Sequence, residues 1–253
     1  MFSLHYVSPG GFKVDLTPRG AGVFLLPEGF SGLVGQADDT SVSSVLFPGQ
    51  TFGGLVVKPA TGELRFGLRG PKGSLPRMWS QFAKLWDRQR EGTLILSSDM
   101  GSVSAKVRLS ESIGPPPSSL KGLTYSPGLN VPLIADSGVW AGPLMHNVGA
   151  VSVENPGDVP IYPHVVWGGA GGQVTLPSGA QFTLPAVQGE RRLLLDDSES
   201  CAVLNDGALD RSVWPISGVM AEPVPPGEAR TFTVPSGARL EWRVKYLNPW
   251  GAV

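Results

Sequence analysis

The 253-residue chain has little charge, a single cysteine and no long apolar run, and each shortage excludes a class of protein. Charged residues make up 16% of the chain and the formal net charge is −1, so little electrostatic repulsion keeps copies apart. The basic residues form no stripe, which argues against a nucleic-acid surface. Cys201 is alone, which excludes an internal disulfide and fits a reducing compartment.

The apolar runs are also too short for a membrane protein. None approaches the roughly 18 to 20 residues that a membrane helix needs. Residues 1–11, MFSLHYVSPGG, lack the basic start and the long apolar region of a secretory signal. We therefore expect neither membrane insertion nor secretion by such a signal.

Turn residues are abundant instead. The chain contains 34 glycines and 24 prolines, yet 41% of its residues are hydrophobic, so we expect it to fold with many turns. A lightly charged surface suits a subunit that packs against others. A compact β-domain with polar serine, threonine and glycine faces would have the same composition.

Short runs in the first third of the chain predict β-strands. Residues 12–16 alternate apolar and polar side chains, as a half-buried strand does. Pro-Gly, Gly-Gly and Thr-Gly pairs separate the further candidates, which are residues 22–27, 41–47, 51–57 and 63–68.

One segment, about residues 75–91, has the periodicity of an α-helix. Ser74 is placed to cap its start and Gly92 to end it. Apolar side chains recur at three- and four-residue spacing and form a wide stripe. Because this stripe carries two tryptophans and a phenylalanine, we expect it to be buried across a sheet or at the end of a barrel. The expected helix-core residues after Leu75 are Met78, Trp79, Phe82, Leu85 and Trp86.

The segment 110–122, SESIGPPPSSLKG, is the best candidate for a linker, because three consecutive prolines favour a stiff, extended chain. We predict a first domain at 1–112, a Pro-rich linker at 113–122 and a second domain at 123–253. The first domain would end in a hairpin of strands 93–96 and 102–109. The second domain has the short strands and turns of a β-sandwich, at residues 149–153, 161–167, 192–195, 202–204, 230–234 and 240–246.

No constellation of residues points to catalysis, a cofactor or a metal. His5, His146 and His164 are far apart and lie beside no cysteine pair or His-Glu-x-x-His pattern. No G-x-S-x-G elbow occurs, and residues 67–74 lack the phosphate-loop pattern. The acidic run 196–199 does not match an EF-hand and is better explained as a solvated turn. We assign no catalytic, cofactor or metal residue and expect no enzyme.

Tryptophans offer a different kind of site, because an exposed indole can stack on a sugar ring. Trp140 and Trp167 are the candidate sugar-stacking residues, and Trp214 and Trp250 are further ones. In a β-sandwich most such side chains belong to the core. Both interpretations stay open at this point.

Several short segments occur in a characteristic order along the chain. RMWSQFAKLW at 77–86 is followed by Gly-Thr-Leu at 92–94 and a paired strand, and VENPGDVPIYPHVVWGG at 153–169 opens the second half. An Asp-bearing strand, an Asn-Asp-Gly hairpin, a Pro-Gly turn and a final strand follow, at 194–197, 203–207, 226–228 and 240–244. In this order, the segments resemble the distal tail (Dit-type) and minor tail proteins of long-tailed siphophages.

The resemblance implies a mainly β fold, in which an N-terminal split β-barrel with one α-helix precedes a galectin-like β-sandwich. It implies a structural protein of the virion, located at the tail tip and made in the host cytoplasm. Such a protein forms a ring, usually of six copies, that joins the tail tube to the baseplate hub and receptor-binding parts. The implied partners are identical copies, the tail tube protein, the tape measure protein and the hub or baseplate proteins. The alternative is a carbohydrate-binding β-sandwich that aids adsorption to a host-surface glycan.

Overall fold

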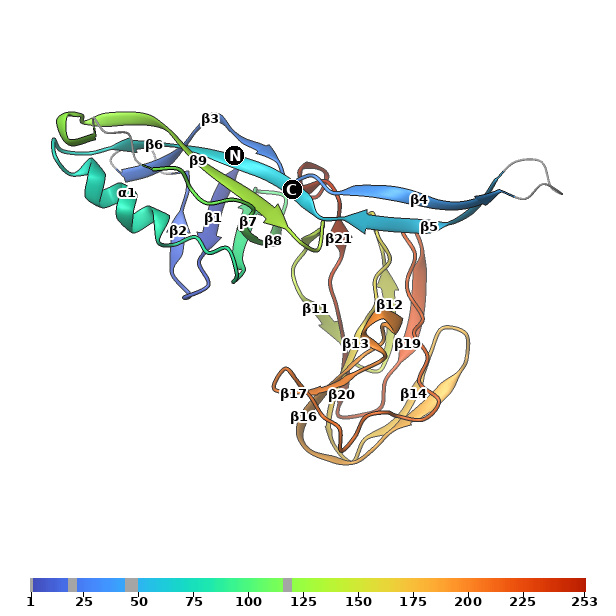
Figure 1. The fold of residues 1–253 in the computed structure, drawn as a ribbon. Coiled ribbons are helices and arrows are strands. Elements are labelled where there is room, and N and C mark those ends of the chain that lie inside the picture. Colours follow the sequence, from blue (N-terminus) through green and yellow to red (C-terminus); the bar gives the residue numbers. More distant parts are fainter. Residues whose placement is uncertain (1, 18–21, 44–49, 116–119) are drawn as a thin grey trace. The chain divides into compact units, whose positions relative to one another are not determined.

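The computed structural model describes residues 2–17, 22–43, 50–115 and 120–253 (Figure 1). These residues are mainly β-strand and contain one α-helix, so the predicted fold class is confirmed. The chain divides into two compact units. The first unit comprises Met1–Ala141 with Tyr246–Val253, and the second unit comprises Gly142–Lys245.

The first unit is built around one curved antiparallel sheet. Along it the described strands follow the order β2-β1-β7-β8-β9-β6-β3. Strand β8 turns the corner, because residues up to Val107 pair with β7 whereas Arg108 and Leu109 pair with β9. The strands are β1 (Ser3–Val7), β2 (Lys13–Asp15), β3 (Gly22–Gly32), β6 (Ala60–Arg69), β7 (Gly92–Ser97), β8 (Ser102–Leu109) and β9 (Tyr125–Ala135); the short β10 (Trp140–Ala141) also pairs with β8.

The sheet encloses the core of the first unit. Side chains alternate between the two faces of a strand, and β7 and β8 bury every second residue. Apolar side chains therefore gather on the inner face of the sheet, among them Leu4, Tyr6, Leu64, Phe66, Leu94, Val107, Val131 and Leu133. This one-sided burial is what the alternating runs in the sequence predict.

The α-helix, α1 (Leu75–Ala83), is shorter than the predicted 75–91. Its last turn tightens, since the Leu85 amide donates to the Phe82 carbonyl at 3.1 Å. The Asp87 carboxylate then accepts hydrogen bonds from the backbone amides of Gln89 at 2.8 Å and Arg90 at 3.1 Å. These bonds, together with the Arg90 side chain, hold the pKa of Asp87 at about 2. The chain therefore makes a capped turn where the stripe predicted two more helical turns.

Both ends of the helix differ from the prediction in detail. The hydroxyl of Ser74 donates to the Pro71 carbonyl at 2.7 Å and does not cap a helix amide. Gly92 begins strand β7 and does not end the helix. The sequence thus locates the helix and its first residue correctly but places its end too late, at 91 where the helix ends at Ala83.

The domain boundary also differs from the predicted one at 113–122. Strand β9 lies beyond that linker, yet it pairs with β6 from Ala60↔Ala135 to Arg69↔Tyr125 and so belongs to the first unit. The second unit therefore begins at Gly142 and not at 123, and the residues from Tyr246 onward belong to the first unit. Parts of two predictions, residues 116–119 of the linker and 44–47 of the strand 41–47, lie outside the described residues.

The second unit is a β-sandwich, as predicted. Each of its two sheets buries one face, with Val165, Leu193 and Leu240 in one sheet and Val153 and Phe232 in the other. One sheet has the order β11-β20-β13-β16-β17-β18 and the other the order β12-β19-β14-β15. Their strands are β11 (Met145–Asn147), β12 (Ala150–Glu154), β13 (His164–Gly169), β14 (Gly172–Thr175), β15 (Gln181–Leu184), β16 (Val187–Leu194), β17 (Val203–Asn205), β18 (Ala208–Leu209), β19 (Ala229–Thr233) and β20 (Ala238–Trp242).

Two strands of the first unit stand apart from its curved sheet. Strands β4 (Gln36–Ser43) and β5 (Gln50–Lys58) form a two-stranded sheet of their own. We call this hairpin the arm, and Figure 1 shows it extending away from the rest of the first unit. The remaining short elements are β21 (Lys245–Tyr246) and the 3-10 turns Leu120–Gly122, Asp197–Glu199 and Pro249–Gly251.

Candidate assembly site

The described residues hold no group of three or more histidine, cysteine, aspartate or glutamate side chains that could bind a metal ion. The acidic run is a capped turn, because Oδ1 of Asp196 accepts from the amide of Ser198 at 2.9 Å and from its hydroxyl at 2.7 Å. Cys201 is half-buried, and burial and the nearby Asp197 raise the pKa of its thiol. Among the described helices, none has the length and apolarity to cross a membrane.

The predicted helix-core residues divide into two groups. Phe82 and Trp86 are 3% and 6% exposed and lie in the main core of the first unit. Met78, Trp79 and Leu85 are half-buried and pack against core clusters from outside. The stripe therefore points inward as a whole, but only two of its five assigned members are fully enclosed.

Trp86 is enclosed by other aromatic rings. Its indole stacks on Tyr6, with ring centroids 3.9 Å apart and an interplanar angle of 14°, and it meets the edge of Phe82 at 5.8 Å. The Tyr6 hydroxyl donates to the Leu85 carbonyl at 3.3 Å. Burial and the nearby Asp87 carboxylate raise the pKa of Tyr6. These contacts fix the segment after α1 to the sheet.

The two candidate sugar-stacking tryptophans are buried. Trp140 is 1% exposed and its Nε1 donates to the Leu33 carbonyl at 2.7 Å. Trp167 is 2% exposed and its Nε1 donates to the Pro185 carbonyl at 3.0 Å. Both rings are enclosed by protein atoms, so neither offers a face on which a sugar could stack.

A network of charges lies on the six-stranded sheet of the second unit. The buried Glu241 carboxylate pairs with Arg192 at 2.9 Å and with Arg239 at 2.7 Å, and Arg239 also reaches Glu190 at 2.8 Å. His164 lies opposite Glu241 in the register of β13 and β20. Because the carboxylate is paired on both oxygens, the network holds strands together and leaves no unpaired catalytic acid at Glu241.

We expect His164 to make the second unit sensitive to mild acid. Burial, and then the charges of Arg192 and Lys245, lower the pKa of His164 to about 4. An unfolded histidine titrates near 6.5. Between pH 6.5 and pH 4 the unfolded chain therefore binds more protons than the folded one, and the free energy of unfolding decreases as the pH is lowered. The expected loss from pH 7 to 4.5 is about 2 to 3 kcal/mol. Urea unfolding at both pH values tests this, and an equal loss in His164→Gln would contradict it.

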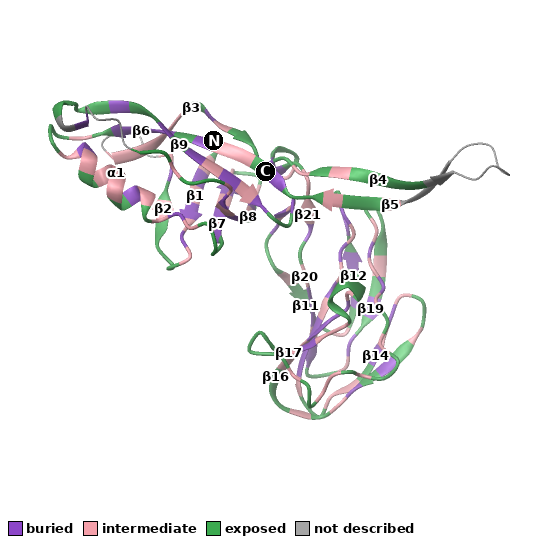
Figure 2. Ribbon diagram, in the orientation of Figure 1, coloured by how far each residue is buried: buried purple, intermediate pink, exposed green. Residues whose placement is uncertain are grey.

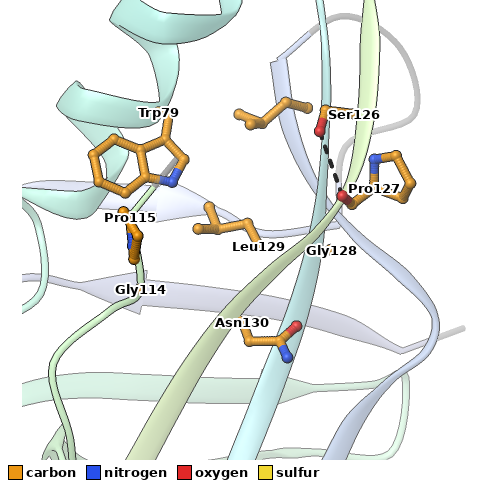
Figure 3. A pocket seen from close by; sticks show the side chains of 9 residues that line it. Trp79, Gly114, Pro115, Ser126, Pro127, Gly128, Leu129 and Asn130 are labelled. Carbon is orange, nitrogen blue, oxygen red and sulfur yellow. Dashed lines mark hydrogen bonds between the residues drawn. The ribbon is translucent and has the colours of Figure 1, made fainter. Parts of the chain in front are cut away.

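A pocket of about 230 Å³ lies beside α1 in the first unit (Figure 3). Trp79 and Pro115 form one side of it, and Ser126, Leu129 and Asn130 of β9 lie across from them. The Ser126 hydroxyl is turned to the Pro127 carbonyl at 3.4 Å. No acid, base or cysteine is among the lining residues, so the pocket offers no catalytic group.

Most of the arm residues whose burial is described are exposed, as Figure 2 shows. Leu55 is 45% exposed and Val56 is 54% exposed. Within the described residues, β4 and β5 pair only with each other, so both outer edges have no strand partner. A two-stranded hairpin alone is marginally stable in water, and unpaired edges favour pairing with another chain. The arm therefore has the properties of an assembly element.

An apolar groove of about 300 Å³ is the second candidate surface, which we call the seam groove. It is lined by Val14 of β2, Val23 of β3, Met78 and Phe82 of α1, and Leu85, together with Gly22 and Gln81. Strands β2 and β3 are the two ends of the described sheet order. The groove thus lies where the sheet of the first unit is not continuous.

Sequence reasoning missed both surfaces as functional features. It predicted strands at 41–47 and 51–57 but not that they pair with each other apart from the main sheet. A signal was available in the polar character of 36–41, QADDTS, which has no regular series of apolar residues that could face a core. The groove has no local signal, because α1 is distant in sequence from β2 and β3.

Comparison with known proteins finds the same fold in solved structures but finds no relative by sequence. No family model and no curated protein matches the sequence. The solved structure of the SPP1 Dit protein, described as a paradigm of the hub adsorption apparatus in phages that infect Gram-positive bacteria, matches with a TM-score of 0.60 and 13% identity. The match covers 97% of this chain and 99% of that one.

The phage P2 baseplate in its activated conformation also matches. The structures with Ca and with Sr each have a TM-score of 0.53 and 9% identity, covering 96% of this chain and 98% of the other. The fold is therefore that of phage tail and baseplate proteins. Within that class it is the Dit-type fold, over nearly the whole chain.

Proposed function

We propose that this protein is a structural component of a phage tail tip, where identical copies form a ring, of six subunits, between the tail tube and the baseplate hub. The observation that carries the proposal is the Dit-type fold over 97% of the chain. The matched proteins are a hub protein and baseplate structures, and none is described as an enzyme. The role proposed for this chain is architectural.

Two features of the chain support a ring. A closed ring repeats one head-to-tail interface around its axis, and the arm is an exposed hairpin whose outer edges pair with no described strand. A net charge of −1 adds little repulsion between neighbouring copies. The partners in this proposal are the tail tube and tape measure proteins on one side and the hub or baseplate proteins on the other, and the location is the virion.

The carbohydrate-binding alternative has less support. It required accessible tryptophans in the β-sandwich, where Trp167 is 2% exposed and Trp214 is half-buried, with its Nε1 donating to the Ser200 carbonyl at 3.1 Å. Trp140 belongs to the first unit and is 1% exposed.

The proposal is tested by the size and shape of the purified full chain. We expect mass photometry to detect particles with six times the mass of the chain, and negative-stain electron microscopy to show rings. Gold-labelled antibodies should bind one end of the tail in intact phage particles. A chain that stays monomeric at every concentration, alone and with the tail tube protein, and that antibodies do not detect in particles, would overturn it.

A further inference from the structure

We propose that the arm of one copy docks in the seam groove of the next copy. This inference rests on the proposed ring and goes beyond it by naming the two surfaces that meet. A head-to-tail ring requires two different, complementary surfaces on each subunit. In Figure 1 the arm and α1 lie at opposite ends of the first unit, an arrangement that lets a subunit contact a different neighbour through each surface.

The arm presents an apolar side that suits an apolar groove. In the register of β4 and β5, Ala37 lies opposite Val57 and Asp39 lies opposite Leu55. Opposite residues of an antiparallel pair project to the same side, so Ala37, Leu55 and Val57 share one side with Asp39. Leu55 is 45% exposed, although it is a large aliphatic side chain.

The seam groove presents apolar side chains from three elements. Val14, Val23, Met78, Phe82 and Leu85 line it, with no charged residue among its lining. Burial of exposed aliphatic surface against such a lining removes apolar area from water, which is favourable by about 25 cal/mol per Å². Docking of the exposed Leu55 in the groove would therefore be favourable, because it would remove apolar surface on both sides from water.

The charges beside the two surfaces are complementary. Arg77 and Gln81 of α1, and Lys84 directly after its last residue, recur at helical spacing and are exposed, and Gln81 lines the groove. Arg77 and Lys84 therefore flank the groove along one side of the helix, whose residues Leu75–Ala83 include no acid.

On the arm, the two aspartates differ in their surroundings. Asp38 is paired with Lys58 at 2.5 Å, whereas Asp39 is exposed on the side of Leu55. Asp39 is thus the carboxylate that docking would bring to the cations of α1. Across the groove, β2 contributes Lys13 and Asp15, and the Asp15 carboxylate is engaged by the Thr17 amide at 2.9 Å.

A charge exchange between the two surfaces tests the docking. Asp39→Lys and Lys84→Asp should each weaken subunit association about tenfold, because each places like charges together. The double variant should return association to within about threefold of the parent, because it restores opposite charges. Mass photometry over a concentration series at low salt measures this. Glu199→Lys, an exposed reversal in the second unit, is the matched control and should change nothing.

Cysteine cross-linking tests the contact without depending on charge. In a Cys201→Ser background, Leu55→Cys with Gln81→Cys should give a ladder of covalent multimers under mild oxidation, and each single cysteine variant should give none. Rings without this ladder and without charge rescue would overturn the docking while leaving the ring in place. A chain that forms no oligomer in any of these variants, parent included, would overturn the ring itself and the docking with it.

Discussion

Replacing Trp86 with alanine is expected to cost about 3 to 5 kcal/mol of the unfolding free energy of the first unit. The indole is 6% exposed and stacks on Tyr6 at 3.9 Å, so its removal leaves a cavity between the post-helix segment and the sheet. The cavity also deprives Phe82 and Phe66 of a ring neighbour. A loss of this size is a large fraction of the stability of an ordinary domain, and thus we expect a much lower melting temperature for the first unit.

The matched control for this prediction is Trp79→Ala. Trp79 belongs to the same apolar stripe but is half-buried and lines the pocket of Figure 3. Its removal should cost about 1 to 2 kcal/mol, since part of its surface already faces solvent. Calorimetry and urea unfolding followed by far-UV circular dichroism measure both variants. Equal costs for the two would mean that Trp86 is no more enclosed than Trp79.

The difference between these two tryptophans shows what a periodic pattern conveys. The stripe from Leu75 to Trp86 correctly predicts a helix with one apolar side, but period alone ranks Trp79 and Trp86 equally. Trp86 follows the end of α1 and is buried from a turn that the Asp87 carboxylate stabilises. The end of the helix depends on that local hydrogen bonding. The turn that Asp87 stabilises replaces two further helical turns, which the residues after Ala83 could otherwise form.

The domain boundary could not be predicted for a different reason. The prolines of 110–122 do indicate a stiff, extended segment, but stiffness does not decide which sheet the next strand joins. The paired residues of β6 and β9 lie about 55 to 75 positions apart in the sequence, and such long-range pairing is favoured by the complementarity of whole sheet faces. By contrast, the turn after β12 was predictable because its signal is local: Asn155 accepts from the Gly157 amide at 3.0 Å through its own side chain.

The arm could be predicted only in part from the sequence. The short apolar runs at 41–47 and 51–57 predict strands, and the structure places β4 and β5 over overlapping residues. What local pattern cannot convey is that these two strands pair with each other and with no other described strand. Asp38, Asp39 and Thr40 are consecutive polar residues and all three are exposed, as expected for a strand that packs on no core.

Replacing Trp167 with alanine should have the largest effect in the second unit, again about 3 to 5 kcal/mol. The ring is 2% exposed, and its Nε1 donates to the Pro185 carbonyl, which follows β15 of the opposite sheet, at 3.0 Å. One side chain thus contributes both core volume and a hydrogen bond between the two layers of the sandwich. Trp167→Phe should cost less, about 1 to 3 kcal/mol, because it keeps most of the volume and leaves one carbonyl without its donor.

The same variant separates a core role from a sugar-binding role. A sugar-stacking tryptophan is accessible, so its removal would abolish glycan binding and leave the melting temperature almost unchanged. A core tryptophan lowers the melting temperature whether or not any glycan binds. Trp250→Ala is the control, since Trp250 is 42% exposed and should cost well below the loss at Trp167. Calorimetry of the three variants beside a glycan array decides the matter: a Trp167→Ala protein that melts like the parent and no longer binds glycan would place this ring at the surface and contradict the sandwich core described above.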